Sequence, residues 1–192
     1  MGKRRFGLTE KRMNDRRFRR VEEAILKVVI NEDYYIGVGE MAKKIGVARS
    51  TVYNHHRAVR EIIPDYEKYL LSRYNRIINK ILKRREMRIR DVMRHVLIFV
   101  LHNREVFMFL EKCGRRGIYG QMMTKMELEL SRRLRLPNNY QKMYIVYRGE
   151  VMELMAEWVK NGVVEEEMNE LLGDIVGLTD TMRIRLKGLL KD

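Results

Sequence analysis

The decisive stretch of this sequence is residues 38–55, which read VGEMAKKIGVARSTVYNH. Two short helices are predicted here, one ending at Lys44 and the other covering residues 49–55. Gly46 separates them, because glycine adopts the positive φ that a sharp turn demands at little steric cost. Ala42 is small enough for the second helix to cross closely over the first. The stretch therefore predicts a helix-turn-helix.

The second helix of this pair is expected to have an apolar side and a polar side. The apolar residues that would hold the two helices at a fixed angle are Met41, Ile45, Val47 and Val52. The exposed side would carry side chains that can hydrogen-bond and none that is acidic, namely Arg49, Ser50, Thr51, Tyr53, Asn54 and His55. Such a surface suits a helix that enters a major groove lined by phosphates.

These residues resemble the tetracycline-repressor (TetR) family of bacterial transcription regulators. The resembling positions are Ala42, Gly46, Val47, Tyr53 and His55. The resemblance covers residues 17–70 and extends more loosely over the rest of the chain. It implies backbone-positioning contacts from two side chains and base reading by four others. The two backbone-positioning side chains are Tyr53 and His55, and the four base readers are Arg49, Ser50, Thr51 and Asn54.

The sequence departs from the family's pattern at four places, one of which is Gly37, where a capping Thr is common. Ala48 stands where a hydroxyl usually caps the second helix, a loss of about 1 kcal/mol unless a neighbour compensates. His56 replaces the usual Phe, and Val59 replaces a Lys near the start of the next helix. The phosphate contact of that Lys is therefore expected from Arg57 or Arg60.

Helical spacing continues on both sides of residues 38–55. Further helices are predicted over residues 17–31, 59–83, 122–134, 140–160 and 164–176, with a last short helix capped by Thr179 or Asp180. No run alternates apolar and polar residues long enough to predict a strand. The expected fold class is all-α. It would combine an N-terminal three-helix helix-turn-helix domain with a C-terminal helical dimerisation and effector domain.

Positive charge points to an anionic partner. The chain has 40 Lys and Arg against 26 Asp and Glu, a net charge of +14. We expect a basic arm over residues 1–20, a DNA-binding domain with its linking helix over 17–84, and the dimerisation and ligand-binding domain over 85–192. The first 84 residues carry a net charge of +11. From charge alone, a solvated tail kept for solubility explains the arm equally well.

Composition excludes several classes of protein. The single cysteine, Cys113, cannot form an internal disulfide, so a reducing cytoplasm is the expected compartment. The longest apolar run, Val96 to Leu101, is far shorter than the ~18 residues that cross a bilayer. Residues 1–20 lack the apolar centre of a secretory signal. We expect no contact with a membrane.

Three weaker signals argue for other chemistry. Residues 37–42 match the loose dinucleotide fingerprint G-x-G-x-x-A, but a helix rather than a strand is predicted before them. His95 and His102 would lie ~10.5 Å apart along a helix, too far to share a metal ion directly. Cys113 has no nucleophile motif around it. We therefore expect no enzyme, no cofactor and no metal.

The C-terminal half contains 11 of the 14 methionines. Met and aromatic side chains can line an adaptable apolar pocket, and the candidates are Met93, Phe107, Met122, Tyr144 and Tyr147. An ordinary helical core explains the same residues equally well. Two apolar stripes suit a four-helix dimer interface, namely Val151, Met152, Met155 and Val159, then Leu171, Leu172 and Ile175. An intrachain core would produce the same stripes.

These expectations combine into a homodimeric regulator that binds double-stranded DNA. A two-fold dimer presents two recognition helices, so its operator should be palindromic. The resemblance implies a repressor that a small apolar effector releases. The alternative is a regulator without an effector, whose C-terminal domain docks a protein partner. An enzyme in which the helix-turn-helix is incidental is the third possibility.

Overall fold

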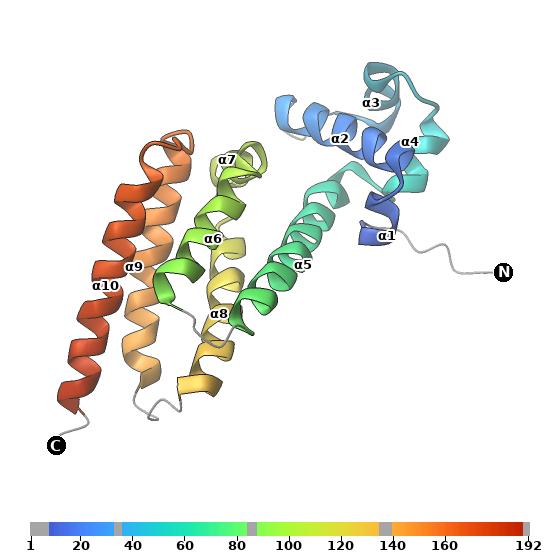
Figure 1. The fold of residues 1–192 in the computed structure, drawn as a ribbon. Coiled ribbons are helices and arrows are strands. Elements are labelled where there is room, and N and C mark those ends of the chain that lie inside the picture. The colour runs from blue at the N-terminus through green and yellow to red at the C-terminus, as the bar shows by residue number, and fades with distance from the viewer. Residues whose placement is uncertain (1–7, 33–35, 84–87, 135–139, 190–192) are drawn as a thin grey trace. The chain divides into compact units, whose positions relative to one another are not determined.

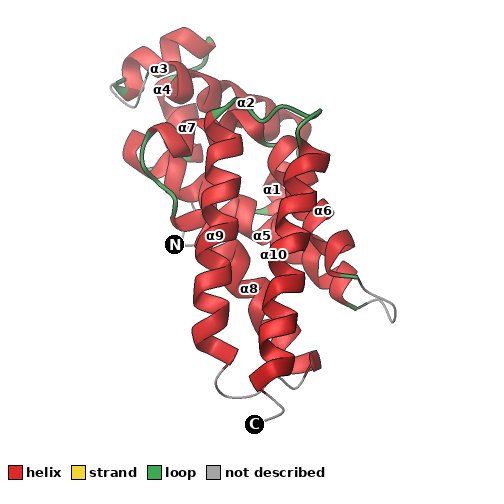
Figure 2. Cartoon of the chain, turned by 90° about the vertical axis from the view of Figure 1, so that its left-hand side faces the viewer, coloured by secondary structure: helices red, strands yellow, loops and turns green. Residues whose placement is uncertain are grey.

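The computed structural model describes residues 8–32, 36–83, 88–134 and 140–189, and within them the chain is all-α, as predicted. Helix makes up 82% of the described residues, and Figure 2 shows helices joined by short loops. No strand occurs in the described ranges. The expectations for Lys3, Arg4 and Arg5 of the arm lie outside them. None of the described helices combines the length and apolar character needed to span a bilayer.

The chain folds as two compact units, Met1–Ser72 and Arg73–Asp192, called here the N-terminal and C-terminal units. The helices, shown in Figure 1, are α1 (Glu10–Met13), α2 (Arg16–Asn31), α3 (Val38–Ile45), α4 (Arg49–His55), α5 (Ile62–Leu82), α6 (Ile89–Leu101), α7 (Arg104–Lys112), α8 (Gly117–Leu134), α9 (Tyr140–Lys160) and α10 (Met168–Leu189). A short 3₁₀ turn, Val59–Glu61, precedes α5. The two units divide inside α5, whereas the sequence suggested a boundary after residue 84.

The N-terminal unit is built on α2, which packs against α1 and α3. Asp15 begins α2, because its carboxylate accepts hydrogen bonds from the backbone N–H groups of Arg17 and Phe18 at 2.8 and 3.1 Å. Ile25 and Val29 are fully buried on the inner face of α2. α3 packs on both α2 and α4.

The C-terminal unit is built on α9 and α10, which lie side by side in Figure 1. α10 also packs on α6, while α9 packs on α7 and α8. A series of aromatic rings forms part of the core, with successive centroids 5.6 to 6.2 Å apart, and consists of Tyr74, Phe99, Phe107 and Tyr119. The Tyr74 hydroxyl donates to the Met122 carbonyl at 3.1 Å. These contacts explain why the second half of α5 belongs to this unit.

Three predicted helix boundaries differ from the structure. α10 runs without a break to Leu189, so the separate last helix is wrong. Thr179 does not cap a helix there, because its hydroxyl donates to the Ile175 carbonyl at 2.8 Å from within α10. α8 begins at Gly117, ahead of the predicted start at residue 122. α1 falls in the region that the sequence assigned only to a basic arm.

Candidate nucleic-acid interface

The turn between α3 and α4 has the geometry that the sequence predicted. Gly46 has φ of +70° and ψ of 35°, the left-handed conformation that ends α3. Its N–H donates to the Lys43 carbonyl at 3.3 Å, and the Val47 N–H donates to the Ala42 carbonyl at 3.0 Å. A side chain at Gly46 would strain this backbone.

The outer face of α4 offers polar side chains to solvent. Arg49, Ser50 and Asn54 are exposed, and Tyr53 is 49% exposed although it is a large aromatic residue. Thr51 is half-buried, and Val52 fixes the inner face with 1% exposure. Arg57, just after α4, is also exposed. None of the exposed side chains is acidic, so the face can approach phosphates and base edges.

The Arg49 side chain lies against α3. A Cβ atom built on Gly39 would come within 2.7 Å of Arg49 Nη2 and 2.9 Å of Arg49 Cζ. The missing side chain at Gly39 therefore makes room for the guanidinium group. This contact gives the proposed base-reading cation a defined position over the helix pair.

Neither helix of the pair has a side-chain cap at its N-terminus. Ala48 precedes α4 and makes no capping hydrogen bond, and Gly37 precedes α3 in the same way. In α4, the Thr51 N–H is bonded to the Ala48 backbone carbonyl at 2.9 Å. The predicted loss of a capping side chain at Ala48 is therefore present in the structure.

His55 differs from its sequence-based placement, because its side chain is buried rather than exposed. The residue is 5% exposed, and its Nδ1 donates to Glu22 Oε1 at 2.5 Å. Its ring also stacks on Phe18, with the centroids 4.0 Å apart and the planes 8° from parallel. The exposed position expected for His55 is therefore wrong: this side chain attaches α4 to α2.

Glu22 is the centre of a buried polar network in the N-terminal unit. Its side chain is fully buried, and its Oε2 accepts from His56 Nε2 at 2.9 Å. The other ring nitrogen of His56 donates to Asp65 Oδ2 at 3.0 Å. Because both ring nitrogens face carboxylate oxygens, the imidazole donates from both and carries a positive charge. The network thus joins α2, the end of α4 and the start of α5.

The pKa values of this network favour its charged form. Burial by itself would raise the pKa of Glu22, but hydrogen bonds from His55 and His56 outweigh burial and lower it. Burial likewise opposes the charge on His56, yet its bonds to Glu22 and Asp65 raise its pKa above the usual value. Charge pairing therefore overcomes desolvation for both groups.

Arg12 holds α4 from a second direction. Its Nη2 donates to the Asn54 carbonyl at 2.9 Å, and its guanidinium carbon lies 4.1 Å from the centroid of the Phe18 ring. Part of the expected basic arm thus packs against the end of α4. The sequence missed this role, because the run of basic residues around Arg12 gives no indication of which one folds back.

The sequence contained a signal for Glu22 that charge counting overlooked. Glu22, Ile25 and Val29 follow at spacings of three and four, which places the carboxylate on the buried face of α2. A buried carboxylate requires a partner, and the adjacent pair His55–His56 supplies two. Nothing local in the sequence indicated Asp65, because its partner lies nine residues earlier across the α4–α5 turn.

The five residues proposed as an effector pocket lie in the core of the C-terminal unit. They are Met93, Phe107, Met122, Tyr144 and Tyr147, and all are buried. The Tyr144 hydroxyl donates to the Met123 carbonyl at 2.9 Å, and the Tyr147 hydroxyl is bonded to Thr179 Oγ1 at the same distance. Their polar atoms are thus satisfied within the chain.

The proposed dimer stripes also face inward. Six of these side chains are buried within a single chain, namely Val151, Met155, Val159, Leu171, Leu172 and Ile175. They face inward because α9 and α10 pack on each other and on α6, α7 and α8. Within a single chain, these side chains therefore belong to the core, as the intrachain alternative expected. Only Met152 is half-buried.

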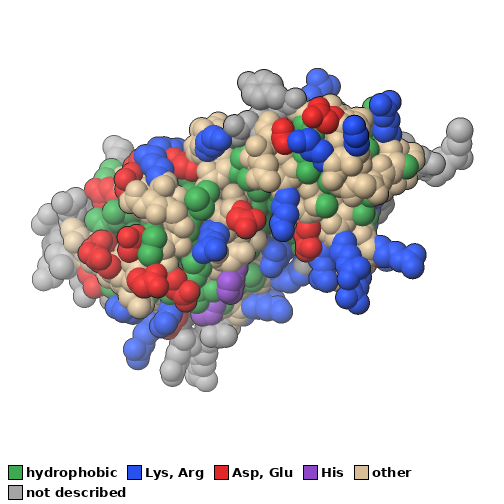
Figure 3. Space-filling view, turned by 90° about the horizontal axis from the view of Figure 1, so that it is seen from above, with side chains coloured by type: hydrophobic (Ala, Val, Ile, Leu, Met, Phe, Trp, Pro, Cys, Tyr) green, Lys and Arg blue, Asp and Glu red, His purple; other side chains and the backbone are tan. Residues whose placement is uncertain are grey.

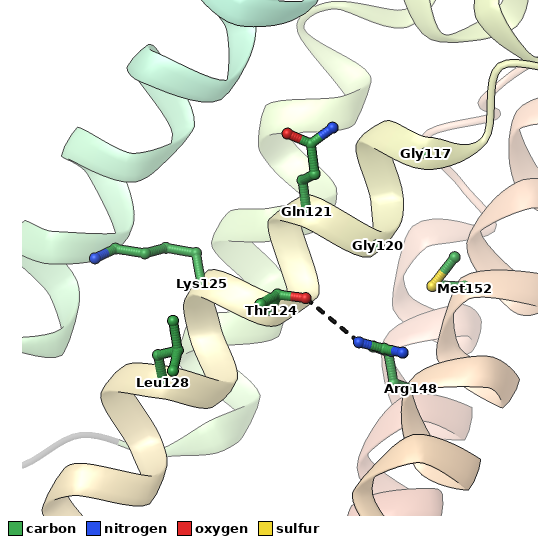
Figure 4. Close-up of a pocket in the computed structure, with 8 residues that line it drawn as sticks. All are labelled: Gly117, Gly120, Gln121, Thr124, Lys125, Leu128, Arg148 and Met152. Carbon is green, nitrogen blue, oxygen red and sulfur yellow. Dashed lines mark hydrogen bonds between the residues drawn. The ribbon is translucent and has the colours of Figure 1, made fainter.

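A surface groove between α8 and α9 has a volume of about 450 Å³ and includes Met152 (Figure 4). Its lining comprises Gly117, Gly120, Gln121, Thr124, Lys125, Leu128, Arg148 and Met152. Arg148 Nη1 donates to Thr124 Oγ1 at 3.4 Å across the groove. Leu128 is 49% exposed, and Ile145 and Val146 on α9 are more than half exposed. These two helices therefore present apolar side chains to solvent.

Charge is unevenly spread over the surface seen in Figure 3. Lys and Arg side chains stand out over the part that holds α2, α3 and α4, whereas Asp and Glu gather where α9 and α10 are joined. The joining segment includes the exposed Glu165, Glu166 and Glu167. An anionic ligand would be repelled from that end of the C-terminal unit.

Within the described ranges, no group of three or more His, Cys, Asp or Glu side chains is arranged to hold a metal ion. Comparisons of the chain with known protein families, curated proteins and solved structures gave no match.

Proposed function

We propose that this protein is a sequence-specific DNA-binding transcriptional regulator. The observation that carries the proposal is the α3–α4 pair, with its left-handed turn at Gly46 and an exposed face on α4 that has no acidic residue. Such a helix fits the width of the major groove. The proposal agrees with the resemblance to the TetR family at residues 42–55.

Two kinds of contact are assigned to the exposed residues. Arg49 and Asn54 are the base readers, because Arg can bridge guanine O6 and N7 and Asn can pair with adenine. Ser50 and Thr51 lie on the same helix and complete the candidate readers. Tyr53 and Arg57 are assigned to the DNA backbone, whose phosphates accept hydrogen bonds and attract cations.

The polar network supports this assignment by fixing α4. His55 is bonded to Glu22, and the Asn54 carbonyl is bonded to Arg12, so the end of the helix is held from two sides. A recognition helix that is held in place loses less conformational freedom on binding than a mobile one. Its specific affinity should benefit accordingly.

A homodimer is part of the proposal, because two recognition helices would read a palindromic operator. The face we assign to the second copy is on α8 and α9, where Leu128, Ile145 and Val146 are exposed. These two helices also carry charges of both signs, which suits pairing across a two-fold axis. Ile145→Asp with Val146→Asp should yield monomers by sedimentation, whereas Glu157→Gln, an exposed position on α9 outside this face, should not.

A repressor released by a small apolar effector remains the first version of this function. The second version is a regulator without an effector, whose C-terminal unit docks another protein. The observation that favours the second is the packing of Met93, Phe107 and Met122 in the core, together with the exposed apolar side chains on α8 and α9. Adding candidate effectors to preformed complexes with DNA would separate the two versions.

The function is tested by selecting bound sequences from a random duplex library. The unchanged protein should enrich one palindromic sequence, and Arg49→Ala or Asn54→Ala should each relax its selectivity by about 1–3 kcal/mol at one base pair per half-site. Arg104→Ala, an exposed cation on α7, is the matched control. Enrichment of no sequence, or equal enrichment by all variants, would defeat the assignment.

A further inference from the structure

Two segments hold essentially all of the excess positive charge. Residues 1–20 carry a net charge of +7, and residues 73–94 carry another +7. Residues 21–72, which contain the helix-turn-helix, have a net charge of −1, and residues 95–192 have a net charge of +1. The body of the N-terminal unit is therefore close to neutral. The second basic segment lies at the start of the C-terminal unit, away from α3 and α4 in the sequence.

The second half of α5 contributes a row of cations. Arg73, Arg76, Lys80 and Lys83 follow at spacings of three, four and three. A helix with 3.6 residues per turn places them on one face, in a row about 15 Å long. Arg73 is half-buried and the other three are exposed. In the sequence of α5, no acidic residue follows Glu67.

The start of α6 adds cations where a helix does not favour them. Arg88 precedes α6, Arg90 is in its first turn, and Arg94 follows one turn later, all of them exposed. The positive end of the helix dipole repels cations at this place, and only Asp91 offsets it. Lys80 and Lys83 lie at the C-terminal end of α5, where the helix dipole attracts cations. The α6 arginines lie at a helix N-terminus, where the dipole repels them. Their positions are therefore explained better by binding than by helix stability.

A polyphosphate backbone fits this surface better than a lipid bilayer does. A helix that binds a bilayer needs a free apolar face beside its cations. The apolar face of α5 is occupied, because Tyr74, Ile78 and Ile81 are buried in the C-terminal unit. A duplex carries one negative charge per ~1.7 Å of its axis, so about 15 Å of duplex presents more charges than the α5 row can neutralise.

We propose that Arg73, Arg76, Lys80, Lys83, Arg88, Arg90 and Arg94 form a second surface for duplex DNA, which contacts phosphates without reading bases. We call it the junction surface. The proposal rests on the proposed function, in that it takes DNA as the partner. It assigns to the C-terminal unit a direct share of the affinity for DNA.

The test compares two variants that remove the same charge. Arg76→Gln/Lys80→Gln/Lys83→Gln removes three exposed cations of the junction surface, and Arg104→Gln/Lys112→Gln/Lys160→Gln removes three exposed cations elsewhere in the C-terminal unit. Binding of the full chain to a random-sequence 40-bp duplex is measured by fluorescence anisotropy over a range of salt concentrations. Since each phosphate contact contributes about 0.9 to the salt slope, the junction variant should lower the slope by up to about 3. Its affinity at low salt should fall about tenfold or more.

Three results would overturn the junction surface. Equal losses in both variants would show that only net charge matters. An unchanged salt slope in the junction variant would show that these cations do not meet phosphates. Loss of binding to phosphatidylserine–phosphatidylcholine vesicles, with DNA binding intact, would assign the surface to membranes.

The same assay separates this proposal from the function it rests on. If the junction variant loses affinity while Arg49→Ala and Asn54→Ala leave selectivity unchanged, the junction surface stands and the recognition helix does not. If those two variants relax selectivity while the junction variant behaves like its control, the reverse holds. If the unchanged chain fails to bind any duplex, both proposals fall.

Discussion

The two units of this protein are stabilised by different kinds of contact. The N-terminal unit contains the short helices α3 and α4 and buries Glu22, His55 and His56 in one polar network. The C-terminal unit has longer helices, and its core is mainly aromatic and aliphatic, with Phe107 and Tyr119 stacked at 5.7 Å. Short helices bury little apolar area, so directional bonds between charged groups contribute a larger share of the free energy that stabilises their packing. The long helices of the C-terminal unit bury more apolar surface, which stabilises them beside the ion pair of Glu111 with Arg116.

The difference also separates two tasks. The charged network positions α4 while leaving the outward side chains of Arg49, Ser50 and Asn54 exposed. Hydrogen bonds have fixed directions, so they define the orientation of a short helix more closely than apolar contacts do. The apolar core of the C-terminal unit sets the spacing of its helices, and the buried Glu111 of this unit is paired with Arg116.

The largest expected effect is on the apolar core of the C-terminal unit. Phe107→Ala should reduce the free energy of unfolding of the C-terminal unit by about 3–5 kcal/mol, because the ring is fully buried between Phe99 and Tyr119. Thermal unfolding followed by calorimetry would measure the loss. Met108→Ala, an exposed neighbour on α7, should change it little. A loss below about 1 kcal/mol for Phe107→Ala would mean that the ring series is not a core.

A slightly smaller effect is expected in the buried polar network of the N-terminal unit. Glu22→Gln should destabilise the N-terminal unit by about 3 kcal/mol, because it leaves the buried His56 cation with only one carboxylate partner. Hydrogen exchange of backbone amides in α2 and α4 would report the loss, while amides of α9 and α10 keep their protection. Glu23→Gln is the matched control, since its exposed ion pair with Arg19 contributes little. Equal protection in both variants would contradict the network.

The pH dependence of stability should distinguish the two units. The raised pKa of His56 gives stability that is present below the histidine's usual value of 6.5 and is lost as the pH rises through the raised value. The lowered pKa of Glu22 gives stability that is present above its usual value of 4.5 and is lost as the pH falls through the lowered value. The N-terminal unit should therefore be most stable between the two usual pKa values, 4.5 for Glu22 and 6.5 for His56.

Amide exchange measured from pH 4 to pH 9 would follow this dependence in each unit separately. Protection of α2 and α4 should fall on the alkaline side after correction for intrinsic exchange rates. His56→Phe removes the titrating imidazole and should therefore remove the loss of stability at alkaline pH. A flat profile for the unchanged protein would show that the network does not titrate with unfolding.

The smallest expected effect is at the start of α4, where no side chain caps the helix. Ala48→Ser should stabilise the N-terminal unit by about 1 kcal/mol, because a hydroxyl can accept the N–H bonds that Ala48 leaves without a side-chain partner. Chemical denaturation would measure the gain. Ala24→Ser, in the middle of α2, is a control away from any helix start. No gain at Ala48 would mean that solvent already satisfies the helix end.

Much of the helix-turn-helix could be predicted because its determinants are close together in the sequence. Gly46 marks the turn, and α4 covers the residues expected for it. The placement of His55 could not be predicted from α4 alone, because its partner Glu22 is 33 residues away. The same limit applied to Arg12 and Asn54, which are 42 residues apart.

The longer helices show the limit more clearly. Periodicity located α9 and most of α10, but it could not tell whether Val151 or Leu172 faces its own chain or a second copy. Both arrangements bury the same stripe. Likewise, Thr179 carries a hydroxyl that can either cap a helix or bond back within one, and only packing decided for the second.

The sequence by itself determined the all-α class, the position of the turn at Gly46 and the two basic segments, 1–20 and 73–94. Each of these depends on local backbone preference, short-range periodicity or a sum of charges, which need no knowledge of distant neighbours. Only the tertiary structure decided that His55 is buried and that the α9 and α10 stripes close on their own chain. Those outcomes depend on which distant side chain satisfies a buried charge or covers an apolar face, and that choice is made when the helices pack.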